Sequence, residues 1–460
     1  MTQKMAPPKK NSSGATAKVA PKESTAMDSV LAVVRMILSV IGSILHRIVS
    51  YHSRQRPFTV AGLADTAELH EKIPRKDMPI KEPDWDKSEI GIWTPKRGYK
   101  LFTRTFKAQA IPPKEEASGS TSKGNKGNKN AIVFYHHGIG GCVSEAYKNV
   151  SGHVLGPWSL CHDLSLDGFD VYGYDAVAHG YSGGYIAEEE GCKHYLPSPT
   201  DVIDDFEDYI DHILNIKGKD TPFFLFGESW GGQVSLLTGL RLQEKKKNFL
   251  GIIFQAPAIH AYIPPAPVVW VFTHLLAPLF PTWISRLMPI NIKSEYGKLI
   301  PIIEILSDHV STVIVNDGNR DNSTQTTSNS PEYSLLTDDP VVEMNITDPK
   351  HCYNANGCPF RMRTAATLLE QNIQVRENLR NVKFPFLCVQ SSGDRVCFPS
   401  GGVALVNESQ TDAKDKKLVT IENCNVHMFT FSTKSYWKMI ANMGPWLDQR
   451  LTMHLAAAGN

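Results

Sequence analysis

The chain has 460 residues, 42% of them hydrophobic and 21% charged, so most of it can form a large globular core. Its formal net charge is +1, and no basic stripe with interleaved aromatic residues is present, so nothing in it points to a nucleic-acid partner. Eight cysteines are too few for a disulfide scaffold. Cys352 and Cys358 are close enough in sequence to pair, but the partner histidines of a zinc site are missing. We interpret these cysteines as free or buried thiols.

The N-terminal region has two segments of different character. Residues 1–26 are rich in Lys, Pro, Ser, Thr and Ala, which predicts a disordered tail. Residues 27–52 are mainly apolar, with one polar stripe at helical spacing that includes Arg35 and Arg47. We expect an amphipathic helix on a membrane surface, with its arginines toward lipid head groups. The alternatives are a transmembrane signal anchor, although Arg35 interrupts the apolar run, and a helix packed on the protein body.

From residue 86 onward, short apolar runs alternate with amphipathic segments. Strands buried on both faces and separated by helices predict a mostly parallel sheet covered by helices on both sides. The first part of this core should comprise residues 86–257 and the second part residues 381–450. Strands are predicted at 90–93, 100–106, 131–136, 169–174, 223–226, 249–254, 386–390 and 418–421, helices at 201–216, 233–242 and 436–447, and a flexible loop at 110–130.

Residues 258–380 interrupt this alternation and are predicted to form a cap, or lid. The segment from Ile263 to Trp283 is strongly apolar and is broken by prolines. It suits either ordinary core or a lid that holds an acyl chain and touches a membrane. Residues 316–330 are polar and predict a disordered excursion.

The pattern Gly-x-Ser-x-Gly at residues 227–231 directly follows the apolar run 223–226 and precedes a helical segment. This strand–turn–helix context is typical of the nucleophile elbow of α/β-hydrolases, which exposes a serine hydroxyl at the top of the sheet. A second match around Ser182 follows a loop rather than a strand, so we interpret Ser182 as structural. Ser229 is therefore the candidate nucleophile.

A serine nucleophile needs a histidine base and a carboxylate that orients the histidine. In α/β-hydrolases the chain order is serine, acid, histidine. Asp394 is the only carboxylate in the turn after the strand at 386–390, and His427 follows the next strand. These two residues are the candidate acid and base, and neither a metal nor a cofactor is needed.

The negative charge that develops on the substrate carbonyl oxygen requires two backbone N–H donors. One should come from Trp230, the residue after the nucleophile. The other should lie in the glycine-rich turn at residues 136–141, and Ile139 is the candidate. An ordinary glycine turn is the alternative.

As a set, these segments resemble the monoacylglycerol lipase and lysophospholipase group of serine hydrolases, over roughly residues 86–450. The resemblance implies an α/β-hydrolase fold with a mostly parallel central sheet, helices on both faces, an inserted helical cap, and cleavage of a monoacylglycerol or lysophospholipid. It is carried by His137-Gly138, by Tyr174-Asp175 to Gly183-Gly184, by Gly227-Glu228-Ser229-Trp230-Gly231-Gly232, by Ser392-Gly393-Asp394-Arg395-Val396, by His427, and by Arg361 to Leu379.

The chain departs from this group in the residues that follow the early His-Gly. Animal members carry a Glu and an Arg that help to hold the glycerol end, where this chain has Gly141 and Glu145. The expected function is hydrolysis of monoacyl lipid esters at a membrane, with the endoplasmic reticulum or the cytoplasmic face as candidate locations. A carboxylesterase or acyltransferase for other esters and a non-catalytic scaffold are the alternatives. The expected partners are a lipid ester and a membrane surface, contacted through residues 27–50 and the cap.

Overall fold

The structure is a computed structural model, and it describes residues 88–109, 128–148, 153–184, 194–261, 263–281 and 361–458. The predicted N-terminal tail and amphipathic helix, the polar excursion at 316–330, and Cys352 and Cys358 lie outside the described residues. Within those ranges, no helix combines the length and the apolar character needed to cross a bilayer.

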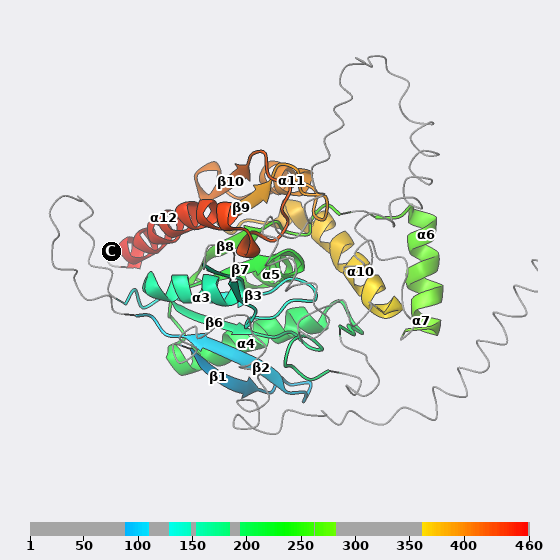
Figure 1. The fold of residues 1–460 in the computed structure, drawn as a ribbon, viewed down its shortest axis with the longest axis horizontal. Helices are drawn as coiled ribbons and strands as arrows, with labels where there is room; N and C mark the ends of the chain where they lie inside the picture. The colour runs from blue at the N-terminus through cyan, green and yellow to red at the C-terminus, as the bar shows by residue number, and fades with distance from the viewer. Residues whose placement is uncertain are drawn as a thin grey trace, which may run out of the picture. The chain divides into compact units, whose positions relative to one another are not determined.

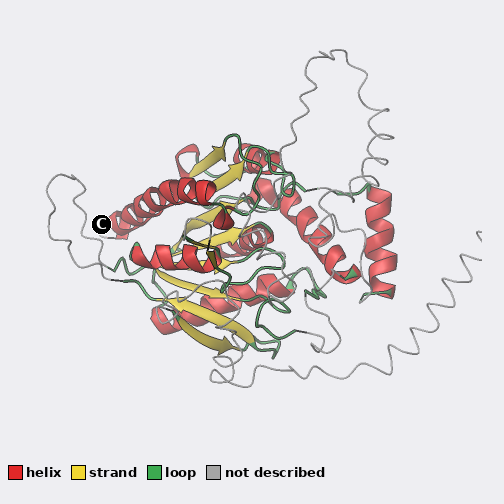
Figure 2. Cartoon of the chain, viewed as in Figure 1, coloured by secondary structure: helices red, strands yellow, loops and turns green. Residues whose placement is uncertain are grey.

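An eight-stranded sheet lies at the centre of the described core (Figures 1 and 2). The strand order is β1-β2-β6-β3-β7-β8-β9-β10, with antiparallel pairing of β1 to β2 and of β2 to β6 and parallel pairing of all later neighbours. The mostly parallel sheet predicted from the sequence is thereby confirmed. The strands are β1 (Glu89–Trp93), β2 (Leu101–Phe106), β3 (Ile132–His136), β6 (Asp170–Tyr174), β7 (Phe223–Glu228), β8 (Phe249–Gln255), β9 (Phe386–Ser391) and β10 (Lys416–Ile421), and a separate pair is formed by β4 (Tyr147–Lys148) and β5 (Val154–Leu155).

Helices cover both faces of the sheet, which is why β7 and β8 are buried along their whole lengths. On one face, α3 (Pro157–Leu166) and α12 (Thr433–Ala458) pack against the sheet in one apolar cluster (Figure 1). On the other face, α4 (Asp201–Lys217), α5 (Trp230–Leu242) and α11 (Ser400–Glu408) contribute to a second cluster. The carboxyl ends of the parallel strands therefore lie between two helical layers, where a site can form.

Most predicted elements are present, with ends that differ by up to two residues for the strands. The helix expected at 233–242 begins earlier, at Trp230, and therefore starts directly after Ser229. The helix expected at 436–447 runs from Thr433 to Ala458 and contains Pro445. The helices α3 and α11 were not expected, because most of their residues are small or polar and give little hydrophobic periodicity.

Within the predicted cap, α6 (Ala266–Val271) continues into the π-helix η3 (Phe272–Leu276) and α7 (Ala277–Leu279), and η3 and α7 lie against α10 (Met362–Asn378) (Figure 1). Helix α10 is joined to the core by hydrogen bonds from buried polar side chains to backbone carbonyl groups. Thr367 donates to Leu196 O, and Gln371 donates to Pro199 O. These bonds fix α10 beside the glycine-rich elbow helix α5, with which it is in contact.

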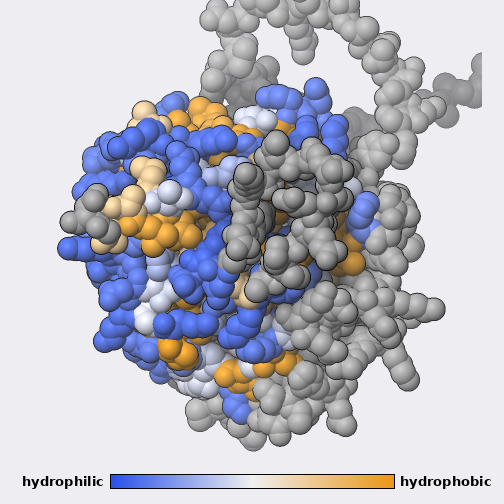
Figure 3. Space-filling model, turned by 90° about the vertical axis from the view of Figure 1, so that its left-hand side faces the viewer, coloured by the Kyte–Doolittle hydropathy of each residue, from blue (hydrophilic) through white to orange (hydrophobic). Residues whose placement is uncertain are grey.

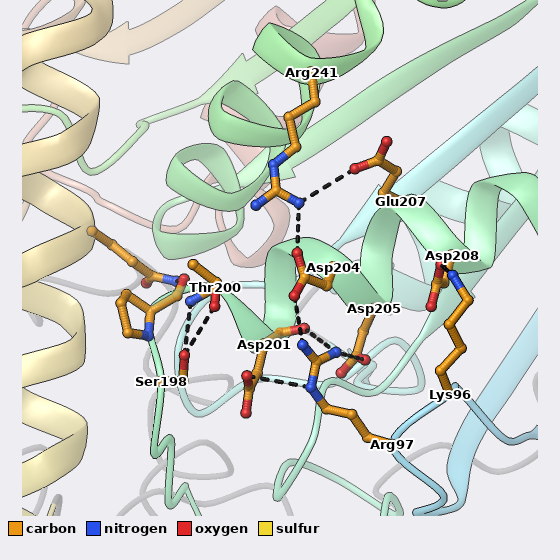
Figure 4. A network of polar contacts seen from close by, with 12 residues as sticks. Lys96, Arg97, Ser198, Thr200, Asp201, Asp204, Asp205, Glu207, Asp208 and Arg241 are labelled. Carbon is orange, nitrogen blue, oxygen red and sulfur yellow. Dashed lines mark hydrogen bonds and ion pairs between the residues drawn. The ribbon is translucent and has the colours of Figure 1, made fainter.

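A network of charged side chains joins the β1–β2 turn to α4 (Figure 4). The Arg97 guanidinium pairs with Asp201, Asp204 and Asp205 at 3.3, 2.5 and 2.9 Å. Asp205 is buried and also accepts a hydrogen bond from the Tyr99 hydroxyl. Burial raises the pKa of the Asp205 carboxyl to about 7 in spite of these partners. The network therefore holds the antiparallel edge of the sheet on α4.

Candidate active site

Ser229 stands at the junction of β7 and α5 in a strained backbone conformation. Its φ is 53° and its ψ is −113°, in the positive-φ region that residues with a side chain rarely adopt. The turn is tight because α5 approaches the end of β3: a Cβ atom on Gly231 would clash with the carbonyl oxygen of His136, the last residue of β3. A glycine is therefore required at position 231, as the elbow pattern predicts.

The structure brings the side chains of Ser229, Asp394 and His427 into one hydrogen-bonded chain. The Ser229 hydroxyl donates to His427 Nε2 at 2.8 Å, and His427 Nδ1–H donates to Asp394 Oδ2 at 2.8 Å. An ionised carboxylate can only accept hydrogen bonds, so the neutral imidazole carries its proton on Nδ1 and leaves Nε2 free to accept from Ser229. All three residues are buried. This geometry allows the imidazole to remove the serine proton while the carboxylate orients it.

Asp394 is fixed by donors on both carboxylate oxygens. The backbone N–H groups of Val396 and Cys397 donate to Oδ1 at 2.8 and 3.0 Å. Gln390 Nε2 donates to Oδ2 at 3.2 Å, beside the bond from His427. The turn after β9 therefore presents Oδ2 to the imidazole and leaves the carboxylate one orientation.

The charges around His427 favour its protonated form. Burial alone would lower the pKa of the imidazole, but the charge and hydrogen bond of Asp394, with a smaller contribution from the charge of Glu228, raise the pKa above its usual value. An imidazole with a raised pKa is a stronger base for the serine proton.

The two predicted backbone donors flank Ser229. Trp230 is the first residue of α5, where N–H groups have no acceptor within the helix. Ile139 follows Gly138, and a Cβ on Gly138 would lie 3.4 Å from Ser229 Cβ, so this turn passes directly beside the nucleophile. Both N–H groups thus belong to segments next to the serine, as an oxyanion site requires.

His137 holds the peptide group that carries the Ile139 N–H. Its Nδ1–H donates to Gly138 O at 2.7 Å, and its Nε2 accepts from Ala176 N–H at 2.9 Å. Burial lowers the pKa of His137 to about 4, so the imidazole is neutral and this pattern of one donor and one acceptor persists near neutral pH. Because Gly138 C=O and Ile139 N–H belong to one planar peptide, this bond also orients the N–H.

Sequence reasoning assigned no role to two further residues next to the triad. Cys397 Sγ lies 3.9 Å from Ser229 Oγ, and the Glu228 carboxylate is buried under the elbow. Cys397 follows Asp394 by three residues, and Glu228 directly precedes Ser229. Their closeness in sequence to two triad members was the signal by which they could have been found. Ser182, by contrast, is used structurally: its Oγ accepts from Phe102 N–H at 2.8 Å and donates to Asp175 O at 2.5 Å.

The sheet, the elbow and the hydrogen-bonded chain at its top define an α/β-hydrolase with a serine nucleophile site. The chain belongs to the family described as serine aminopeptidase, S33, whose model matches residues 152–431, more than half of the chain. The predicted membership of the monoacylglycerol lipase-like α/β-hydrolases is confirmed by this match together with the relatives described next, and the chain is a serine ester hydrolase.

Curated relatives include two kinds of esterase. Caffeoylshikimate esterase of Arabidopsis thaliana is 23% identical over 326 residues, which is 69% of this chain and 73% of that protein. Monoglyceride lipase of Mus musculus is 24% identical over 298 residues, which is 64% of this chain and 74% of that protein. Both relatives are named for the cleavage of esters.

Solved structures show the same fold. A soluble variant of monoglyceride lipase from Saccharomyces cerevisiae, in complex with a substrate analog, matches with a TM-score of 0.52 and 16% identity, covering 79% of this chain and 94% of that one. A lipase in an open form matches with a TM-score of 0.55 and 14% identity, covering 79% of this chain and 99% of that one. At these identities, the likeness supports the α/β-hydrolase fold.

Proposed function

We propose that this protein hydrolyses the acyl ester of monoacyl lipids, either monoacylglycerols or lysophospholipids, through an acyl-enzyme on Ser229. The observation that carries the proposal is the hydrogen-bonded chain of Ser229, His427 and Asp394 at the nucleophile elbow. The names of the monoglyceride lipase relatives support the monoacyl substrate.

The hydrogen bonds of the triad define how protons move during the reaction. The Ser229 hydroxyl attacks the ester carbonyl carbon while its proton moves to His427 Nε2, and Asp394 stabilises the imidazolium that forms. The N–H groups of Ile139 and Trp230 stabilise the negative charge on the carbonyl oxygen. His427 then gives its proton to the leaving alkoxide. Water, deprotonated by the same imidazole, releases the fatty acid and restores the serine.

A panel of esters tests the substrate class. The enzyme should hydrolyse a long-chain monoacylglycerol or lysophosphatidylcholine with a kcat/KM at least about tenfold above that for p-nitrophenyl acetate, because a long acyl chain adds apolar contact. Preference for the acetyl ester would instead indicate a carboxylesterase. Acyl transfer to an added alcohol in place of water would indicate an acyltransferase. Failure to react with a fluorophosphonate probe would indicate a scaffold without catalysis.

The outer side of the cap supports a second proposal, that the enzyme works at a membrane surface. Trp270 is 60% exposed and Leu275 is 48% exposed, and Val268, Val271 and Leu279 add further exposed apolar area on α6, η3 and α7. A helical segment with apolar residues on its outer side suits the apolar boundary of a lipid layer. On the side where α12 ends, the described residues that Figure 3 colours are mainly hydrophilic, with hydrophobic patches between them.

Replacing Trp270 and Leu275 together by serine should weaken binding to phosphatidylcholine vesicles by about 10- to 100-fold, because two large apolar side chains no longer enter the lipid. Vesicle sedimentation measures this binding. The matched control is Leu455→Ser on α12, which removes an apolar side chain that is 55% exposed on another helix. Equal vesicle binding by wild type and the double variant would refute the role of the cap.

Residues 27–50 carry the other part of the membrane proposal. Cell fractionation of the full chain should place it in the membrane fraction, and a chain without residues 27–50 should shift toward the soluble fraction. A full chain that stays soluble would contradict the predicted membrane association.

A further inference from the structure

Glu228 is a buried carboxylate next to the nucleophile to which the mechanism above gives no role. It is the last residue of β7 and is 1% exposed. None of the ion pairs between described residues includes it. A buried carboxylate without a cationic partner is costly unless hydrogen bonds stabilise it, so its surroundings need an explanation.

Three neutral donors surround the carboxylate. The Tyr135 hydroxyl donates to Oε2 at 2.7 Å, and Gln255 Nε2 and the Thr430 hydroxyl donate to Oε1 at 2.8 and 2.9 Å. An ionised carboxylate can only accept hydrogen bonds, and here both oxygens accept from donors and neither donates. The structure therefore keeps a negative charge directly under the elbow.

The third donor connects this charge to the base. Thr430 lies three residues after His427, in the histidine loop (residues 422–432), which joins β10 to α12. Its side chain is fully buried, and its hydroxyl has the Glu228 carboxylate as acceptor. The residue beside the nucleophile thus holds the loop that carries the imidazole.

We propose that Glu228 is a positioning residue of the catalytic centre, which fixes the histidine loop through Thr430 and supplies a second negative charge that stabilises the His427 imidazolium. Asp394 acts on the Nδ1 side of the ring through a hydrogen bond, whereas Glu228 acts on the ring through its charge and has Tyr135, Gln255 and Thr430 as its hydrogen-bond donors. This inference rests on the proposed function, because it assigns a role within the same reaction.

The other titratable groups around this centre do not change charge near neutral pH. Burial raises the pKa of the Tyr135 hydroxyl and of the Cys161 and Cys397 thiols well above their usual values, so all three stay neutral. The remaining charges are those of Asp394, of Glu145, which acts on Tyr135, and of the buried Arg104, which acts on Cys161; all three are the same in wild type and in a Glu228 variant. A change in the titration of His427 in a Glu228 variant can therefore be assigned to Glu228.

The decisive experiment is the pH dependence of fluorophosphonate labelling in wild type and in Glu228→Gln. The amide keeps the shape of the side chain and removes the charge, so the acid limb of the labelling rate should move to lower pH by about 0.5–1 unit. At the plateau the rate should fall by roughly tenfold, because the imidazolium that forms during attack loses stabilisation. Coincident profiles in folded wild type and variant would overturn the proposal.

Two further variants separate charge from position. Thr430→Val keeps the charge of Glu228 and removes the hydrogen bond from the Thr430 hydroxyl. The kcat for p-nitrophenyl butyrate should then fall about three- to tenfold, while KM and the acid limb of the pH profile stay unchanged. Thr430→Ser should restore kcat. Tyr135→Phe, the matched control, removes a donor on the other oxygen and should leave the acid limb in place. If Glu228→Gln does not fold, equal kcat values for Thr430→Val and Thr430→Ser overturn the proposal.

The labelling readout separates this inference from the proposed function. Labelling requires an activated Ser229 but no lipid, so a wild type that labels rapidly and fails on every monoacyl lipid refutes only the substrate class. A wild type that labels and hydrolyses, with a Glu228→Gln profile identical to its own, refutes only the role of Glu228.

Discussion

Replacing Ser229 by alanine should lower kcat for monoacylglycerol hydrolysis by about 10⁴-fold or more, with little change in the stability of the fold. The hydroxyl is the atom that bonds to the acyl carbon, and no described side chain at the site repeats the hydrogen bond from Ser229 to His427 Nε2. Alanine keeps the Cβ atom at a backbone position that is already strained, so the elbow should form as before. Release of fatty acid measures the effect.

The chain offers a matched control in Ser182, the serine of the second Gly-x-Ser-x-Gly pattern. Ser182→Ala removes two hydrogen bonds of a loop and should reduce the free energy of unfolding by about 1–3 kcal/mol while kcat stays close to wild type. The two serines share a sequence pattern and differ in structural context. If Ser229→Ala retains activity in a clean preparation and Ser182→Ala loses it, the nucleophile has been assigned to the wrong serine.

The candidate triad could be predicted from the sequence because each member follows a strand: Ser229 directly follows β7, Asp394 lies three residues after the end of β9, and His427 lies six residues after the end of β10. Strands β7 and β9 and residues 418–421 of β10 are mainly apolar, and the carboxyl ends of neighbouring parallel strands meet at one edge of a sheet. The chain order of serine, acid and histidine then selected Asp394 and His427 from many candidates. Local sequence pattern and strand topology therefore point to the same three residues.

The surroundings of the triad could not be read in the same way, because they depend on contacts between distant segments. Glu228 contacts Tyr135 and Thr430, which are 93 and 202 residues away in the chain. Four of the seven buried residues of helix α10 are threonine, glutamine or asparagine, so hydrophobic periodicity gave little sign that this face packs against the core. Buried polar side chains are specified by their partners, and the partners become known only with the fold.

Asp394→Asn should lower kcat by about 10⁴-fold while KM changes little, and the reason lies in the donors around the carboxylate. Oδ1 accepts from the N–H groups of Val396 and Cys397, so the amide oxygen of asparagine should occupy that position. The amide NH₂ then replaces Oδ2 and faces His427 Nδ1–H, donor against donor. The imidazole should turn to the tautomer with its proton on Nε2, which cannot accept the proton of Ser229.

The kinetic signature separates this tautomer change from simple misfolding. The variant should keep the thermal midpoint of wild type within a few degrees, because asparagine fills the same volume. Only the bond to His427, which reverses its direction, and the long bond from Gln390 Nε2, which is lost, are affected. Fluorophosphonate labelling should slow by a factor similar to the loss in kcat, since both reactions need the same proton transfer. Glu228→Gln loses roughly tenfold by our inference, because its charge acts without contact. An Asp394→Asn enzyme that loses no more than Glu228→Gln would show that direct contact with the imidazole is not what makes a carboxylate essential here.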